Sequence, residues 1–252
     1  MTSLRAASLQ PVIAVYLREL RAYFLTPLAY VFIAIFLLAL GAFTFQVGRF
    51  FDTGRADLAP FFLFHPWLYL VFLPALAMRT WSDDIQTGAI ELAMTLPAPT
   101  WMLVVGKFLA AWTAAAAALA LTFPMWMSVA WLGEPDHAAI ALTHAMSFLM
   151  AGGYLAIGCA VSSLAGSQVV AFVVSVAIGF VFTACGLPLV TSGATSLFGA
   201  GAADILASLS LLTHFEAAQR GVLEARALVY YLTFIAFWLA LNVLWVDARR
   251  GR

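Results

Sequence analysis

Residues 140–164 read IALTHAMSFLMAGGYLAIGCAVSSL, a stretch without a single Asp, Glu, Lys or Arg. A transmembrane helix needs about 20 consecutive, mostly apolar residues, so this stretch is long enough to cross a bilayer. Small residues recur in it at Gly152, Ala156 and Ala160. This four-residue spacing lets helices approach one another closely in lipid. The stretch therefore predicts a membrane-spanning helix that packs tightly against its neighbours.

Five further stretches of the chain have the same character, and the sequence predicts an all-α integral membrane protein with six spans. The whole chain of 252 residues is 64% hydrophobic and only 10% charged, whereas a soluble domain carries roughly 25% charged residues. A single transmembrane domain, residues 1–252, accounts for this composition. The predicted spans are residues 28–47, 61–78, 108–132, 140–164, 169–190 and 227–246.

The composition also excludes several classes of protein, namely a cytosolic enzyme, a disordered tail and a disulfide-rich secreted module. Twelve basic and twelve acidic residues give a formal net charge of zero, so we expect no nucleic-acid partner. Two cysteines define no disulfide framework, and the four histidines have no metal-ligand spacing. We therefore predict no metal and no cofactor on this chain.

The basic residues predict the orientation in the membrane. Six spans place both termini on one side, and cytoplasmic loops of membrane proteins carry an excess of Lys and Arg. With cytoplasmic termini, eight basic residues lie inside and four outside. The inner residues are Arg5, Arg18, Arg21, Arg79, Lys107, Arg249, Arg250 and Arg252, and the outer ones are Arg49, Arg55, Arg220 and Arg226.

The N-terminal segment, residues 8–26, is predicted to be an amphipathic helix in the cytoplasmic interface. Its apolar residues recur at helical spacing, while Arg18 and Arg21 lie toward the other face. Pro27 is expected to redirect the chain into the first span. The alternative is an ordinary juxtamembrane extension. The apolar residues are Leu9, Val12, Ile13, Tyr16, Leu17, Leu20 and Phe24.

The cytoplasmic segment between the second and third spans, residues 79–107, is predicted to contain a short amphipathic helix that binds a partner. We expect Ser82 to cap this helix, with Asp83 and Asp84 in its first turn, where the helix dipole favours acids. Thr87 and Gly88 interrupt the pattern. Ile90, Leu92 and Leu96 then form an apolar ridge beside Glu91. The alternative is a loop on the lipid headgroups, which the acids oppose because anionic lipid repels them.

The outer segment, residues 191–226, begins rich in Gly and Ser and then becomes apolar at Ile205–Leu212. This apolar part is too short to span a membrane, and we expect it to dip back into the outer leaflet where protein covers its backbone. Thr213 and Glu216 form a predicted capping box that starts a helix, and Gly221 suits the end of that helix.

The order of these features resembles the type-2 permease subunit of ATP-binding-cassette (ABC) exporters. Residues 79–99, RTWSDDIQTGAIELAMTLPAP, are similar to the coupling helix of that family, in which an acidic stretch is followed by TG-x-x-E-L and LP-x-P. Residues 213–232, THFEAAQRGVLEARALVYYL, are similar to the gliding-motility-associated branch. One departure is Ala89, where the family usually has a second Thr after Thr87 and Gly88.

The resemblance implies that this chain forms the transport pathway through the membrane and that a separate ATPase subunit supplies the energy. Two copies of a cytoplasmic ABC ATPase, carrying ATP and Mg²⁺, would contact the coupling helices of two permease subunits, identical or different. The chain itself contains no phosphate-binding loop, since Trp101 stands where the glycine that would begin it is required before Gly106-Lys107. The implied setting is the bacterial inner membrane, without ATPase activity on this chain.

The spans carry no Asp, Glu, Lys or Arg in their middle, which favours an amphiphilic or lipid-like cargo over a small ion. A secondary transporter or channel remains an alternative, although it would call for internal repeats and polar sites within the spans. A membrane-embedded enzyme is a third class. Ser162, Ser163 and Ser167 lack a His on a facing span, and no paired acids mark a catalytic site.

Overall fold

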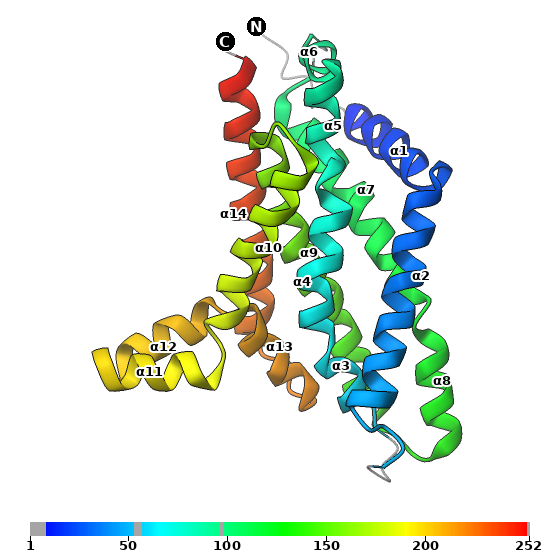
Figure 1. Cartoon of the computed structure of the whole chain (residues 1–252), viewed down its shortest axis with the longest axis vertical. Helices are drawn as coiled ribbons and strands as arrows, with labels where there is room; N and C mark the ends of the chain where they lie inside the picture. Colours follow the sequence, from blue (N-terminus) through cyan, green and yellow to red (C-terminus); the bar gives the residue numbers. More distant parts are fainter. Residues whose placement is uncertain (1–8, 53–56, 96–97, 251–252) are drawn as a thin grey trace, which may run out of the picture.

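The computed structural model describes residues 9–52, 57–95 and 98–250, and in this part of the chain all regular secondary structure is helical. The helices follow one another with short connections and form an elongated bundle (Figure 1). They are α1 (Gln10–Leu25), α2 (Pro27–Ala42), the π-helical turn η1 (Phe43–Val47), α3 (Ala59–Leu63), α4 (His65–Ala77), α5 (Arg79–Thr87), α6 (Ala89–Met94), α7 (Thr100–Ala120), α8 (Phe123–Leu132), α9 (His137–Leu164), α10 (Gln168–Ala184), α11 (Pro188–Phe198), α12 (Ala200–Leu209), α13 (Leu211–Gln219) and α14 (Ala225–Arg250).

Four stretches are long and apolar enough to span a membrane: Ala29–Val47, Thr100–Leu132, His137–Leu164 and Ala225–Arg249. These stretches indicate a membrane protein, and they contain four of the predicted spans. Two of the four starts differ from the prediction by three residues or more. The helix predicted from residue 108 begins at Thr100, because Pro99 in an extended conformation ends the preceding loop, and the helix predicted from residue 140 begins at His137, where Asp136 caps it.

The two other predicted spans are interrupted. Residues 61–78 divide at Phe64 into α3 and the 13-residue α4. Pro66 lies in the first turn of α4 and cannot donate the backbone hydrogen bond that would continue α3. Residues 169–190 divide after Ala184, and α11 departs from α10 at an angle of 66°. The described chain thus has four candidate spans, or five if this bent pair counts as one, and the count of six stays a prediction.

Helix α9 forms the centre of the bundle. Most of its side chains are buried, whereas α2 at the edge exposes most of its surface. Small residues permit the close packing: a Cβ on Gly158 would lie 2.5 Å from the Cβ of Ala77 at the end of α4. Hydrogen bonds between hydroxyl groups also join α9 to its neighbours, at 2.8 Å from Ser147 to Tyr69 and at 2.6 Å from Tyr154 to Thr183.

The predicted N-terminal helix is confirmed over Gln10–Leu25, and Ser8 lies outside the described residues. Thr26 is extended and α2 begins at Pro27, so the chain turns where Pro27 predicted it. The prediction of a single apolar face was too simple. Val12 and Val15 are buried, but Ile13 and Leu17 are exposed. Helix α1 therefore has one apolar side that packs against the bundle and a second apolar side that is exposed.

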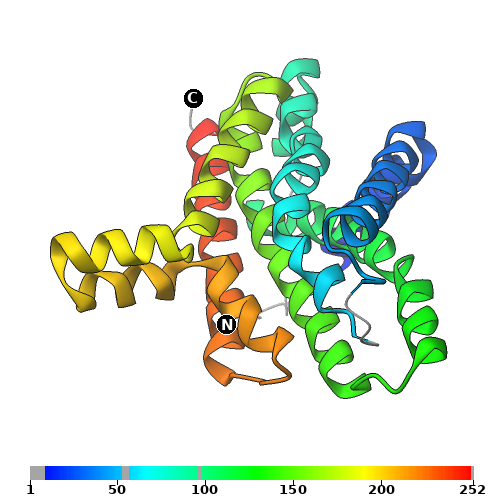
Figure 2. The same cartoon turned by 60° about the horizontal axis from the view of Figure 1, so that its bottom comes forward.

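The segment predicted to face outward, residues 191–226, forms two parts. Helices α11 and α12 make a hairpin that projects sideways from the bundle in both views (Figures 1 and 2), and α13 lies against α9. Ile205–Leu212 is therefore not one segment. The chain is extended at Ser210, which leaves Ile205 exposed on α12 and buries Leu211 and Leu212 at the start of α13.

The predicted capping box at Thr213 and Glu216 is wrong. Helix α13 begins three residues earlier than predicted, because Ser210 is its cap: the Ser210 Oγ accepts hydrogen bonds from the backbone N–H groups of Leu212 (3.1 Å) and Thr213 (3.3 Å). Thr213 and Glu216 consequently lie inside the helix. Gly221 follows its last turn with a left-handed φ of 74°, which a glycine adopts without strain, as predicted for the helix end.

Replacing Ser210 by Ala is expected to lower the free energy of unfolding by about 1 kcal/mol, because an N-terminal cap of α13 is lost. Chemical denaturation in detergent micelles measures this change. Thr213→Ala is the matched control, since the Thr213 hydroxyl caps nothing, and it should have a smaller effect. A larger loss in Thr213→Ala than in Ser210→Ala would contradict the assignment of the cap.

Candidate functional site

The segment predicted to bind a partner lies at one end of the bundle. Helices α5 and α6 are found there with α1 and the C-terminal end of α14 (Figure 1). Gly88 separates the two short helices with a left-handed φ of 72°, and it ends α5 as the predicted interruption required. The basic residues of these helices that were predicted to be cytoplasmic, such as Arg18, Arg79 and Arg249, therefore lie at the same end of the molecule.

Ser82 is not the cap that the sequence predicted. Helix α5 begins at Arg79, since Met78 keeps a helical backbone and α5 follows α4 almost directly. Ser82 is buried inside α5, and its hydroxyl donates a hydrogen bond to the Met78 carbonyl. Asp83 and Asp84 accordingly lie beyond the first turn of α5. At these positions the helix dipole stabilises them little, because its effect is confined to the first turn.

Asp83 and Asp84 instead bind partners within the chain. The Asp83 carboxylate accepts a hydrogen bond from Arg79 Nε at 2.9 Å and another from the Gln168 side chain at the start of α10. Asp84 Oδ2 lies 2.9 Å from Nζ of Lys107, as an ion pair without hydrogen-bond geometry. These acids fix α5 to the bundle.

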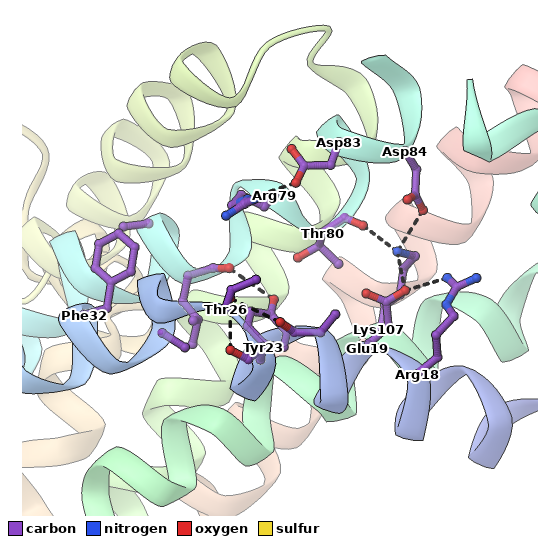
Figure 3. Close-up of a pocket in the computed structure, with 14 residues that line it drawn as sticks. Arg18, Glu19, Tyr23, Thr26, Phe32, Arg79, Thr80, Asp83, Asp84 and Lys107 are labelled. Carbon is purple, nitrogen blue, oxygen red and sulfur yellow. Dashed lines mark hydrogen bonds and ion pairs between the residues drawn. The ribbon is translucent and has the colours of Figure 1, made fainter. Parts of the chain in front are cut away.

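Lys107 is the centre of this arrangement. It is the only lysine of the chain, and its side chain is 3% exposed in α7. Its Nζ donates hydrogen bonds to the Glu19 carboxylate at 3.0 Å and to the Thr80 carbonyl at 2.7 Å (Figure 3). A buried ammonium group is tolerated only where charges and acceptors compensate for lost water. The Lys107 cluster, defined as Lys107, Glu19, Thr80 and Asp84, thereby joins α1, α5 and α7.

Glu19 is ionised in this cluster. Its burial by itself raises the pKa of the carboxyl group, but the charge of Lys107 and the hydrogen bonds from Arg18 and Lys107 outweigh burial, and the net pKa is lowered. Arg18 contributes through a contact of 2.6 Å to Glu19 Oε1. The carboxylate is therefore charged at neutral pH, and the contact between α1 and α7 is a true ion pair.

A second contact across the bundle holds the junction between α4 and α5. The Ser162 Oγ of α9 accepts hydrogen bonds from the backbone N–H groups of Trp81 and Ser82, both at 3.1 Å, and donates one to the Met78 carbonyl at 2.8 Å. Ser162 is fully buried. The sequence offered no local sign of this role, because Ser162 lies about 80 residues away from the junction.

The apolar ridge predicted for α6 is only partly available to a partner. Ile90 is buried in a small apolar cluster of this chain together with Val15, Leu103 and Val246, because α6 folds back onto the bundle. The side chain of Leu92 and the whole of Leu96 lie outside the described residues. Thr87, Gly88 and Glu91 are exposed, and they form the outward face of the segment.

A cavity of about 370 Å³ opens beside the Lys107 cluster (Figure 3). Five helices line it: α1, α2, α4, α5 and α7. Within the described residues, no group of three or more His, Cys, Asp or Glu side chains gathers as metal ligands would. The cavity is lined by ammonium, guanidinium and carboxylate groups on one side and by apolar side chains on the other.

No protein-family model matches the sequence, and no curated protein is significantly similar to it. The resemblance of residues 79–99 to a coupling helix therefore depends on those residues alone. Lys107, Glu19 and Ser162 were missed as members of the site. For Lys107 a signal existed, because it is the chain's single lysine within the apolar run WMLVVGKFLAAW of residues 101–112.

Proposed function

We propose that this chain is the permease subunit of an ABC transporter of the type-2 exporter class, which exports or extracts an amphiphilic or lipid-like cargo. The observation that supports the proposal is the α5–α6 segment. It is short, broken at Gly88, exposed at Thr87 and Glu91, and bound on its inner side to α1, α7, α9 and α10.

This geometry suits a mechanical coupling element. A force applied to the outward face of α5–α6 would reach α7 through Asp84 and Lys107, α1 through Lys107 and Glu19, and α9 through Ser162. Rigid elements joined by short, buried contacts move as a unit, because packed interiors resist deformation. The ATP-driven closure of two ATPase subunits would thus shift several membrane helices together.

The proposal includes the surroundings of the chain. The bundle would lie in a bacterial inner membrane with both termini and α5–α6 in the cytoplasm, α1 in the interface and the α11–α12 hairpin on the outer side. It would pair with a second permease, identical or different, with membrane lipid around both. Helices α3 with α4, and α10 with the first residues of α11, would complete six spans, and residues 205–212 would lie in the outer leaflet.

The experiment is copurification of an ATPase with the tagged full chain, comparing wild type with Glu91→Lys. Glu91 is the exposed acid of α6, so a reversed charge at the contact is expected to reduce ATPase recovery by about tenfold or more. Glu134→Lys is the matched control, because Glu134 is an exposed acid that follows α8, a helix at the other end of the bundle from α6 (Figure 1). This control should leave recovery unchanged.

Two outcomes would contradict the proposal. Absence of any ATP-hydrolysing subunit from the purified wild-type complex would favour a secondary transporter or channel. Equal recovery and equal coupling of hydrolysis to transport in Glu91→Lys, Glu134→Lys and wild type would remove α6 as the contact.

A further inference from the structure

The cavity beside the Lys107 cluster continues into an apolar groove between α2, α4 and α7. Cavity and groove share three lining residues, Ala29, Phe32 and Leu76, so they are neighbouring parts of one depression. The groove reaches along α2 to Phe36 and along α7 to Ala118, and Tyr69 supplies its single polar side chain. A charged chamber of about 370 Å³ that continues into a narrow apolar groove of about 40 Å³ matches the headgroup and part of one acyl chain of an amphiphile.

The charges of the chamber are balanced. Its charged lining residues are the three cations Arg18, Arg79 and Lys107 and the three carboxylates Glu19, Asp83 and Asp84. A site for an anion alone would carry an excess of positive charge, because a ligand charge is stabilised by opposite charges around it. A headgroup that itself carries both signs complements a chamber of this kind.

One cation of the chamber, Arg79, has unused hydrogen-bond donors. Among the described residues, Arg79 contacts Asp83 through Nε only, which leaves its terminal amino groups for a phosphate. Its side chain is 39% exposed, so a ligand can reach it. Arginine binds phosphate oxygens through paired hydrogen bonds, and carboxylates on the same wall can accept hydrogen bonds from a primary ammonium group.

We propose that this depression binds one membrane phospholipid with a zwitterionic headgroup that has a primary ammonium group, as in phosphatidylethanolamine. The phosphate lies at Arg79, the ammonium group at the carboxylates of α5, and an acyl chain lies along the groove between α2, α4 and α7. The chamber volume of about 370 Å³ is within the range of roughly 300–1,000 Å³ found for ligand pockets. Binding depends on cavity and groove alone, and only transport of this lipid rests on the proposed function.

The test is lipid titration of the delipidated full chain in detergent, followed by native mass spectrometry. Phosphatidylethanolamine, phosphatidylcholine and phosphatidylglycerol with the same acyl chains are the probes. We expect one tight site for phosphatidylethanolamine and about tenfold weaker binding of phosphatidylcholine, whose quaternary ammonium group cannot donate a hydrogen bond. Phosphatidylglycerol, an anion without the ammonium group, should also bind more weakly.

Two variants locate the site. Arg79→Gln removes the phosphate partner and should weaken phosphatidylethanolamine binding by about tenfold, while Arg226→Gln, an exposed arginine at the start of α14, should not. Ala118→Leu fills the groove without touching the charged chamber, and it should weaken all three lipids alike. A thermal unfolding scan of each variant without lipid confirms that the bundle is intact.

Tighter binding of phosphatidylglycerol than of phosphatidylethanolamine would overturn the proposal, as would equal binding of all three lipids. Unchanged binding in both Arg79→Gln and Ala118→Leu would place the lipid elsewhere on the protein. Because this experiment needs no ATPase, its failure and the failure of the proposed function are separate results.

Discussion

Lys107→Met is expected to lower the free energy of unfolding by about 3 kcal/mol, since it leaves the Glu19 and Asp84 carboxylates without their shared cation in a mostly buried site. We place the loss at the lower end of the range measured for broken buried ion pairs because Glu19 keeps its contact with Arg18. Denaturant unfolding in detergent micelles measures the loss. Trp81, whose ring centroid lies 5.1 Å from the Lys107 ammonium, is a fluorescence reporter beside the change.

A compensating variant separates charge from packing. Glu19→Gln and Asp84→Asn together with Lys107→Met remove the unpaired carboxylates, and this triple variant should recover a large part of the lost stability. Full stability of Lys107→Met alone would show that the cluster contributes little. Under the proposed function, the same variant should bind the ATPase and yet couple hydrolysis to transport poorly.

The single lysine allows an independent measurement. Because Lys107 is the only side-chain amine, an amine-reactive reagent reports the opening of the junction between α1, α5 and α7 in the folded protein. Modification of Lys107 should be slow in wild type and faster in Glu19→Gln, which removes the negative charge from one of the two hydrogen-bond acceptors of Nζ. Equal rates would mean that Glu19 does not restrain the lysine.

Gly158→Ala is expected to separate α9 from α4 and to destabilise the protein by about 1–3 kcal/mol, the usual cost of overpacking a core. The added Cβ would stand 2.5 Å from the Cβ of Ala77. Both atoms are attached directly to helical backbones, so neither can move aside by a change of rotamer. The strain would therefore reach the α4–α5 junction that Ser162 holds one turn later on α9.

The control for this substitution is Gly41→Ala in α2, where an added Cβ meets no atom within 4 Å. This change should be neutral or stabilising by about 0.5–1 kcal/mol, since alanine favours a helix more than glycine does. Thermal unfolding of the two variants beside wild type measures both effects. Equal unfolding temperatures for Gly158→Ala and Gly41→Ala would contradict the close contact of α9 with α4.

The amino-acid sequence was enough to indicate a helical membrane protein and to locate four long apolar stretches and the N-terminal helix. Apolar runs such as residues 140–164 are long enough to span a bilayer however the helices pack, because length and hydropathy are properties of the sequence alone. Helix starts and ends set by single residues could also be predicted, as at Pro27, Gly88 and Gly221. The fixed φ of proline and the left-handed φ of glycine act within one or two peptide units, so no distant contact is needed. These features depend on local chemistry and on solvent.

The tertiary structure decided which polar side chains bind one another. Ser82 and Thr213 had the spacing of helix caps, but both lie inside helices. Helix α5 begins at Arg79 because Met78 keeps a helical backbone, and α13 begins at Leu211 because Ser210 is extended and caps it. Ile90 had the spacing of an exposed ridge, yet α6 folds back and buries it.

The Lys107 cluster shows the physical reason most directly. Lys107 binds Glu19, which is 88 residues distant, and the carbonyl of Thr80, which is 27 residues distant. No local sequence pattern encodes such pairs. A charged group in an apolar bundle binds the opposite charges that helix packing brings within reach. That packing depends on the shapes of many small side chains at once.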